Sequence, residues 1–256
     1  VDTRIESNAN THMLFVDGTN NRVGVGTTPD LGTGLHIRTS DGGGAVHANG
    51  DNLVIEQSDK PGMSFVSGTS GFGTIYFSDG ADANAYRGFI QYGHTADQLI
   101  FGTSSTTHMK IDSIGAVTKP LQPAFLAHAA SVQTNITSGT TVAFGTERFD
   151  QNADFSSNTF TAPVTGRYRL DVNIRVDNIT TNTAFFSAAL TTSNYSYNNL
   201  ISTNQWDADP AQMMFAMSIL VDMDANDTAV VQVSENSSSD TGDVSTASFF
   251  SGNLVC

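Results

Sequence analysis

The strongest constraint on the fold of this chain is the strict alternation of polar and apolar side chains over residues 167–174, Arg-Tyr-Arg-Leu-Asp-Val-Asn-Ile. Successive side chains of a β-strand point to opposite faces, so this alternation predicts a half-buried strand. Its buried face would carry Tyr168, Leu170, Val172 and Ile174. Two turn-like segments, 154–158 and 164–166, enclose a shorter predicted strand at 159–163.

The composition favours strands along the whole chain. Only 14% of the 256 residues are charged, and Thr, Ser, Asn and Gly, which suit strands and turns, fill the difference. The net charge of −14, with 11 basic residues against 25 acidic ones, argues against binding to a nucleic-acid backbone. The longest apolar run, near 213–221, is too short for membrane insertion. Cys256 is the single cysteine, so we expect no internal disulfide framework.

Residues 1–118 predict a series of short strands, and those within 41–118 recur about every ten residues, a rhythm typical of β-repeats. The predicted strands are 13–16, 22–26, 52–56, 62–66, 73–77, 88–92, 98–101 and 108–111. Gly24 and Gly26 fall on one face, where the absence of side chains lets another backbone, such as that of a partner chain, approach closely. A phosphate-binding loop is a weaker interpretation of these glycines, because no helix pattern follows them.

These predicted strands are short and poor in large apolar residues. A single chain would therefore bury little surface, while each ordered residue loses backbone entropy worth about 1–2 kcal/mol. Three chains around one axis would bury the inner faces and pair the strand edges. We predict an all-β shaft in which three chains are intertwined or lie side by side.

A motif in this region resembles the β-repeats of phage tail fibres and related virion fibres. It consists of Arg-Val-Gly-Val-Gly-Thr at 22–27, Pro29, and Leu-His-Ile at 35–37. Residues 11–17 recur in similar form at 107–112, which supports a repeat. The repeat would place His12 and His108 at equivalent strand positions. Threefold symmetry could then gather three imidazoles around a metal ion, although ordinary core or surface histidines are the simpler interpretation.

Two prolines within 119–123 indicate a stiff linker, and the alanine-rich segment 124–130 that follows has a high helix propensity. From here on the chain resembles the head domain of complement C1q, which shares the jelly roll of tumour necrosis factor. The resemblance rests on Phe-Asp at 149–150, Phe-Thr-Ala-Pro-Val-x-Gly-x-Tyr at 160–168, an alternating strand at 227–233, and Ser-x-Phe-Ser-Gly-x-Leu at 248–254. Because heads of that family begin with a strand of the form Pro-Ala-Phe-x-Ala, the resemblance predicts a strand at 124–130 in place of the helix.

The resemblance covers residues 121–256 and implies a ten-stranded jelly-roll head that forms trimers. In the family order, further strands are expected at 183–190 and 212–221. We therefore expect three parts: the shaft at 1–118, the linker at 119–123 and the head at 124–256.

Catalytic residues are not evident from the sequence. None of the six histidines lies in a nucleophile elbow or a metalloprotease motif, and Cys256 is not a credible nucleophile. Asp207 and Asp209, beside Trp206, could be the two acids of a glycosidase, but a polar loop tip explains them as well. We therefore expect no enzymatic activity, with a polysaccharide depolymerase as the alternative.

A calcium site is possible at Asp222, Asp224 and Asp227, which have the spacing of oxygen ligands along a short loop. The resemblance supports this possibility, because some heads of the C1q family bind calcium near the trimer axis. A plain turn between two strands is the alternative. No other cofactor is predicted.

For recognition we select Tyr195, Tyr197, Trp206 and Asp207, which lie in an Asn- and Ser-rich stretch at 191–209. Aromatic rings beside amide donors suit sugars, and Tyr and Trp are the side chains that contribute most to protein contacts. Internal packing of the two tyrosines along a strand is the alternative.

Together the two resemblances predict a homotrimeric, receptor-binding fibre protein of a bacteriophage, located on the virion outside the cell. Its partners would be other virion fibre or baseplate proteins, and a host cell-surface glycan or outer-membrane protein. A bacterial secreted adhesin is the remaining alternative.

Overall fold

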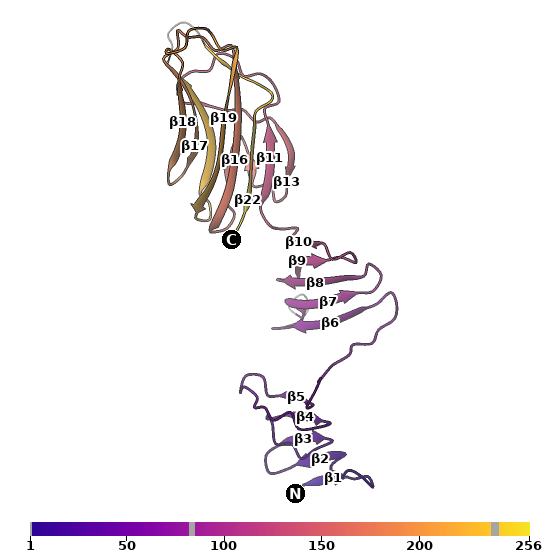
Figure 1. Ribbon diagram of the computed structural model, residues 1–256. Coiled ribbons are helices and arrows are strands. Elements are labelled where there is room, and N and C mark those ends of the chain that lie inside the picture. Colours follow the sequence, from indigo (N-terminus) through magenta and orange to yellow (C-terminus); the bar gives the residue numbers. More distant parts are fainter. Residues whose placement is uncertain (1, 82–84, 237–240) are drawn as a thin grey trace. The chain divides into compact units, whose positions relative to one another are not determined.

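The structure is a computed structural model that describes residues 2–81, 85–236 and 241–256 (Figure 1). Those residues form strands and turns without an α-helix, which confirms the all-β prediction. None of them lies in a helix long and apolar enough to cross a membrane. The chain divides into two compact units, residues 1–73 and 74–256. The division predicted from sequence, with a linker at 119–123, remains a prediction.

The first unit contains one five-stranded sheet in the order β1-β2-β3-β4-β5. Its first three strands are antiparallel, whereas β3, β4 and β5 are parallel. The strands are β1 (Thr3–Ile5), β2 (Leu14–Asp17), β3 (Arg22–Val25), β4 (Leu35–Arg38) and β5 (Leu53–Glu56). Each strand is only three or four residues long, so the unit depends on what covers the two faces of the sheet.

The glycines of the fibre-like motif are crowded by the chain's own backbone. A Cβ atom at Gly24 would lie 2.2 Å from the carbonyl oxygen of Thr27, and one at Gly26 would lie 2.2 Å from that of Arg38. Gly26 also has a φ of +81°, which other residues rarely adopt. The prediction of close backbone approach is therefore correct, but a partner chain is not its cause at these two positions. The chain's own backbone fills the space, through the loop after β3 at Gly24 and the end of β4 at Gly26.

A second five-stranded sheet follows in the order β10-β9-β8-β7-β6. Its strands are β6 (Phe72–Phe77), β7 (Gly88–Gly93), β8 (Gln98–Thr103), β9 (Thr106–Ile111) and β10 (Val117–Thr118). The predicted strand at 62–66 is wrong: that segment pairs with no strand, and Val66 is 94% exposed. His12 and His108 are also not equivalent, because His12 lies in a turn before β2 whereas His108 lies within β9.

The C-terminal part is a sandwich of two sheets. One contains β13 (Thr146–Asp150), β11 (Ala124–His128), β22 (Phe249–Leu254), β16 (Gly166–Asp177) and β19 (Gln212–Met223) in that order, with β21 (Asp243–Val244) beside β16. The other contains β14 (Phe155–Ser156), β15 (Thr159–Thr161), β20 (Thr228–Glu235), β17 (Phe185–Thr192) and β18 (Ser196–Ser202), with β12 (Thr140–Thr141) beside β20. Each described sheet thus has five strands on its continuous path and one short strand off it; the resemblance predicted ten strands in all.

The alanine-rich segment is a strand, as the resemblance predicted and helix propensity did not. β11 pairs with β13 on one side and with β22 on the other, so both edges of its backbone are hydrogen-bonded. Phe125 and Ala127 point into the core and are almost fully buried. Tertiary pairing on two sides therefore overrides the local preference of alanine for a helix.

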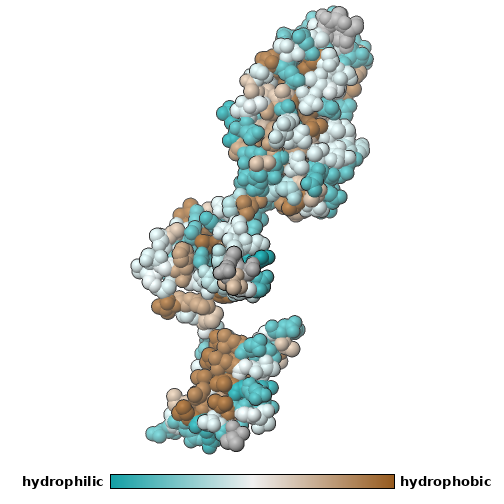
Figure 2. All heavy atoms as spheres, turned by 180° about the vertical axis from the view of Figure 1, so that it is seen from behind, coloured by the Kyte–Doolittle hydropathy of each residue, from teal (hydrophilic) through white to brown (hydrophobic). Residues whose placement is uncertain are grey.

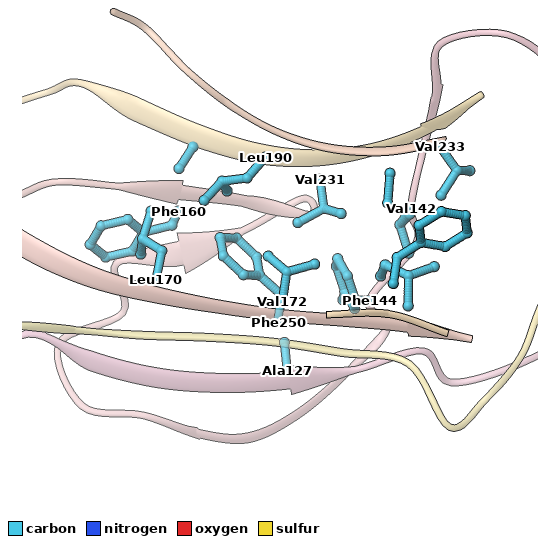
Figure 3. Packing of buried hydrophobic residues seen from close by; sticks show 14 of the residues in the cluster. Ala127, Val142, Phe144, Phe160, Leu170, Val172, Leu190, Val231, Val233 and Phe250 are labelled. Carbon is cyan, nitrogen blue, oxygen red and sulfur yellow. The ribbon is translucent and has the colours of Figure 1, made fainter. Parts of the chain in front are cut away.

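The core lies between the two sheets, and β16 has the predicted alternation (Figure 3). Its four predicted inward residues, Tyr168, Leu170, Val172 and Ile174, are all buried. The hydroxyl of Tyr168 donates a hydrogen bond of 2.7 Å to the carbonyl oxygen of Val164, which satisfies the one polar atom of this row. From the other strands come phenylalanine rings, with Phe125 stacked against both Phe155 and Phe160 at 4.9 Å between centroids.

We expect Leu170→Ala to destabilise the sandwich by about 2–5 kcal/mol, because it leaves a cavity in a core that cannot fully collapse around it. Leu200→Ala removes the same atoms from the exposed side of β18 and should cost less than about 0.5 kcal/mol. Urea unfolding followed by the fluorescence of the single tryptophan, Trp206, reports on the sandwich rather than on the first unit. Equal losses for the two variants would show that Leu170 is not a core residue.

A second expectation concerns Asp154. Burial raises the pKa of its carboxyl, and the neighbouring charge of Asp150 raises it further. The folded state therefore holds the proton more tightly than the unfolded chain. The stability this gives is present at low pH and is lost as the pH rises through the folded pKa.

Asp154→Asn should accordingly raise the melting temperature at neutral pH, and the gain should shrink on acidification. Melting curves from pH 3 to pH 8 measure this, with Asp207→Asn, at an exposed loop position, as the control. A gain that is independent of pH would mean that ionisation of Asp154 is not its cause.

Candidate functional site

The predicted recognition residues fall into two places on the sandwich. Tyr195 and Tyr197 lie at the start of β18, and their rings meet edge to face with 4.9 Å between centroids. Tyr195 is 65% exposed, whereas Tyr197 also packs against the core. Trp206 and Asp207 lie in the loop between β18 and β19.

A shallow groove runs between β18 and β19, the last strands of the two sheets. It has a volume of about 450 Å³ and is open to solvent along its length. Its lining consists of Tyr195, Ser196, Tyr197, Asn198, Asn199, Met217, Ser218 and Ile219. Two aromatic rings beside amide and hydroxyl groups match the chemistry expected of a sugar or peptide contact. The sequence anticipated the tyrosines of this groove but not the residues that β19 contributes. Trp206 and Asp207 do not line it.

Within the possible acid pair, Asp209 lacks the raised pKa of the acid that protonates a glycosidic oxygen. The Oδ1 atom of Asp209 accepts hydrogen bonds from the backbone nitrogen of Thr181 at 2.6 Å and from its hydroxyl at 2.8 Å. These bonds lower the pKa of the Asp209 carboxyl, whereas the acid that protonates a glycosidic oxygen needs a raised pKa. Asp209 is better explained as the residue that ties its loop to Thr181.

The three aspartates of the possible calcium site each have partners within the protein. Asp222 lies on the exposed side of β19, with its Oδ1 atom 3.9 Å from Nε of Arg167. Asp227 accepts hydrogen bonds from the backbone nitrogen of Asp224 at 2.9 Å and from the side-chain nitrogen of Asn194 at 2.7 Å. This is the arrangement of a side chain that closes a turn. Calcium binding here remains a prediction.

Across the described ranges, one group of three potential metal ligands comes together, and the sequence did not reveal it. It consists of Asp30, His36 and Glu56, in the first unit. The three residues are separated in sequence. The parallel register of β4 and β5 brings His36 and Glu56 together, because Arg38 pairs with Glu56 and His36 with Val54. Asp30 joins them from the loop before β4. The available signal was the similarity of two segments, Leu-His-Ile-Arg and Leu-Val-Ile-Glu. It indicates the cluster only if the two strands are assumed to pair in parallel.

One face of the first sheet is apolar and uncovered. Its cross-strand pairs form two continuous rows that run across all five strands, Ile5-Leu14-Val25-Ile37-Ile55 and Val16-Val23-Leu35-Leu53, with Thr3 completing the second. We call these nine apolar residues the apolar face. Six of them are exposed: Ile5, Leu14, Val16, Val25, Leu35 and Leu53. Figure 2 shows hydrophobic side chains gathered over this unit.

The opposite face of the same sheet is covered by the chain itself. Phe15, Gly24, His36 and Val54 form its central row and are all buried. A monomeric protein rarely leaves so continuous an apolar surface in water, so the apolar face is a candidate interaction surface.

Comparison with known proteins gives a family for the sandwich. Residues 124–255, just over half of the chain, match the model of the C1q domain. Among solved structures, the globular domain of zebrafish complement 1qA matches with a TM-score of 0.40 and 14% identity, over 53% of this chain and 98% of its own. Murine APRIL at pH 5.0 matches with a TM-score of 0.39 and 9% identity, over 52% of this chain and 99% of its own.

Comparison with curated proteins gives no match. The assignment therefore rests on the family model, whose range begins at the first residue of β11 and ends one residue after β22. The same range contains both sheets of the sandwich and the whole of its core. The chain belongs to the C1q domain family.

Proposed function

We propose that this protein is a homotrimeric fibre protein of a bacteriophage, in which residues 1–118 form the shaft and the C1q domain forms a head that attaches the particle to a host surface. The observation that supports this best is the apolar face of the first sheet. An isolated chain would leave two rows of Leu, Ile and Val side chains in water. Full burial of each such side chain would contribute about 1.5–3 kcal/mol of stabilising free energy.

Three copies of the chain would bury all of their apolar faces in one closed arrangement. If three sheets stand around a common axis with their apolar faces inward, every row meets an identical row and no apolar surface is left over. C1q and tumour necrosis factor-like domains typically form homotrimers, so the head would impose the same symmetry on the residues before it. The faces covered by the chain's own loops would then point outward.

The head would supply recognition. The groove between β18 and β19 is the surface we assign to the host glycan or outer-membrane protein, with Trp206 and Asp207 as further contacts from the adjoining loop. A shallow, open groove favours weak binding at each copy. Three copies on one rigid support would bind a dense cell surface much more tightly than one. In this proposal the N-terminal end joins other fibre or baseplate proteins, and the protein acts outside the cell on the virion.

The oligomeric state tests the proposal directly. Light scattering on the full chain should give three times 27.1 kDa, about 81 kDa. We expect Leu35→Glu, which puts a charge in the apolar face, to make residues 1–118 sensitive to protease while the head keeps the trimer together. Val66→Glu places the same charge at a position that is 94% exposed and should leave the protease pattern unchanged. A well-folded monomer, or equal sensitivity of the two variants, would contradict the trimeric shaft.

Recognition by the head is tested separately. Tyr195→Ala and Trp206→Ala should each leave the mass of the trimer unchanged and weaken binding to a glycan microarray or to host cells about tenfold or more, as loss of an aromatic anchor typically does. Val164→Ala changes a side chain that is 46% exposed elsewhere on the head and serves as the control. If both aromatic variants bind as well as the unmodified protein, the groove and its loop are not the receptor-binding surface.

A further inference from the structure

We propose that the first unit contains a binding site for a divalent transition-metal ion of the Zn²⁺ type, with Nδ1 of His36 and Oδ1 of Asp30 as its protein ligands. Glu56 and Arg38 are the residues that position these two ligands. The site lies on the loop-covered side of the sheet, away from the apolar face, so the proposal is independent of the trimer and of the virion function.

His36 is held rigidly in a buried position. Its side chain is 0% exposed, and its Nε2 atom lies 2.8 Å from Oε2 of Glu56, which is also buried. The other carboxylate oxygen of Glu56 accepts a hydrogen bond of 2.6 Å from the backbone nitrogen of Gly42. Since a carboxylate only accepts hydrogen bonds, Nε2 of His36 must carry the proton. In neutral His36 the lone pair is therefore on Nδ1.

That lone pair has no hydrogen-bond partner. Nδ1 of His36 is buried and unpaired among the described residues, although Oδ1 of Asp30 is 3.3 Å away. Both atoms are acceptors when His36 is neutral and Asp30 is ionised, so their closeness is unfavourable unless a proton or a metal ion lies between them. A buried polar atom without a partner is rare in native proteins and points to a missing ion or water.

The charges of the cluster favour a further cation when His36 is neutral. Asp30 and Glu56 bring two negative charges, and Arg38 supplies one positive charge through Nη1, 3.0 Å from Asp30 Oδ2 and 3.6 Å from Glu56 Oε2. With neutral His36 one negative charge is left over, although Glu56 and His36 are buried. Burying an uncompensated charge is costly. A bound metal ion or a second proton on His36 would supply the missing positive charge, and ¹H–¹⁵N correlation spectra distinguish the two.

The geometry fits a metal ion in this role. Zinc bonds of about 2.0–2.2 Å at a tetrahedral angle separate two ligand atoms by roughly 3.3–3.5 Å. The observed separation of Nδ1 and Oδ1 is 3.3 Å, yet the two atoms make no hydrogen bond with each other. A histidine that binds zinc through one ring nitrogen usually donates a hydrogen bond from its other nitrogen to a group such as a carboxylate.

Each ligand has such a support here: Glu56 orients His36, and Arg38 orients Asp30. One potential ligand atom from each of Asp30, His36 and Glu56 lies within 4.8 Å of the others. The Asp30 side chain is 56% exposed, so an ion can enter from solvent and complete its coordination with water. The bound ion would join the loop that carries Asp30 to strand β4.

Zinc titration of the full, untagged chain after dialysis against a chelator tests the site. Calorimetry should show one Zn²⁺ per chain, and the melting temperature of the first unit should rise with Zn²⁺ concentration. Asp30→Asn keeps the size of an exposed side chain and should weaken zinc binding at least tenfold. Glu56→Gln, which removes the charge that orients His36, should weaken it about 10–100-fold.

His47→Asn is the matched control, because His47 is an exposed histidine outside the cluster, and it should leave zinc affinity unchanged. Long-range ¹H–¹⁵N correlation spectra of the metal-free protein should show a proton on Nε2 of His36 and none on Nδ1, with the Nδ1 signal moving when Zn²⁺ is added. Absence of zinc binding, binding that survives Asp30→Asn, or a proton on both ring nitrogens that zinc does not displace would overturn the proposal.

Discussion

A β-sheet has two faces, and each must be covered before a sheet of short strands is stable; this requirement explains most of the structure. In the head the two sheets cover each other. The row of Tyr168, Leu170, Val172 and Ile174 on β16 faces the buried residues of β17 and β20. Phenylalanine rings from other strands pack in the same core. On the outer faces, β16 carries polar side chains, but Met214 and Leu220 of β19 are more than half exposed. Within one chain, the head therefore meets the requirement for the two inner faces of its sheets.

The first unit satisfies it on one side only. Loops fold back over Gly24, whose missing side chain lets the carbonyl of Thr27 lie against the sheet. The other side is the apolar face, where the register of five strands aligns leucine, isoleucine and valine in two unbroken rows. Because side chains alternate along a strand, a shift of one residue in any strand would break both rows. So exact an alignment on an uncovered surface is the physical reason for proposing that further copies of the chain cover it.

The sequence was sufficient where the evidence is local. Alternation over residues 167–174 predicted which side of β16 is buried, because the period of a strand depends on nothing beyond the strand itself. The alanine-rich start of the head shows the limit of local evidence: propensity favoured a helix, and only the resemblance to the C1q head gave the strand. That strand exists because β13 and β22 bond both of its edges, and those partners are distant in sequence.

Long-range register was beyond prediction for the same reason. The segment 62–66 has the composition of a strand but no partner strand, and His12 and His108 share a similar sequence but lie in a turn and in a strand. Of the recognition residues, Tyr195 and Tyr197 came together because they are close in sequence, one just before β18 and one within it. The contribution of β19 to the groove required the contact between two sheets. The cluster around His36 depends on a parallel pairing that no short motif encodes.

The two faces of the first sheet thus differ in what they still need. The apolar face needs only to be covered. Any matching apolar surface would cover it, and identical copies would do so with symmetry. The loop-covered face carries two carboxylates, one guanidinium and a buried imidazole nitrogen that has no hydrogen-bond partner among the described residues. Hydrophobic burial cannot correct a charge imbalance, because moving the cluster further from water makes the imbalance more costly. The proposed self-association and the proposed ion binding therefore answer separate deficits, so the loss of one should leave the other in place.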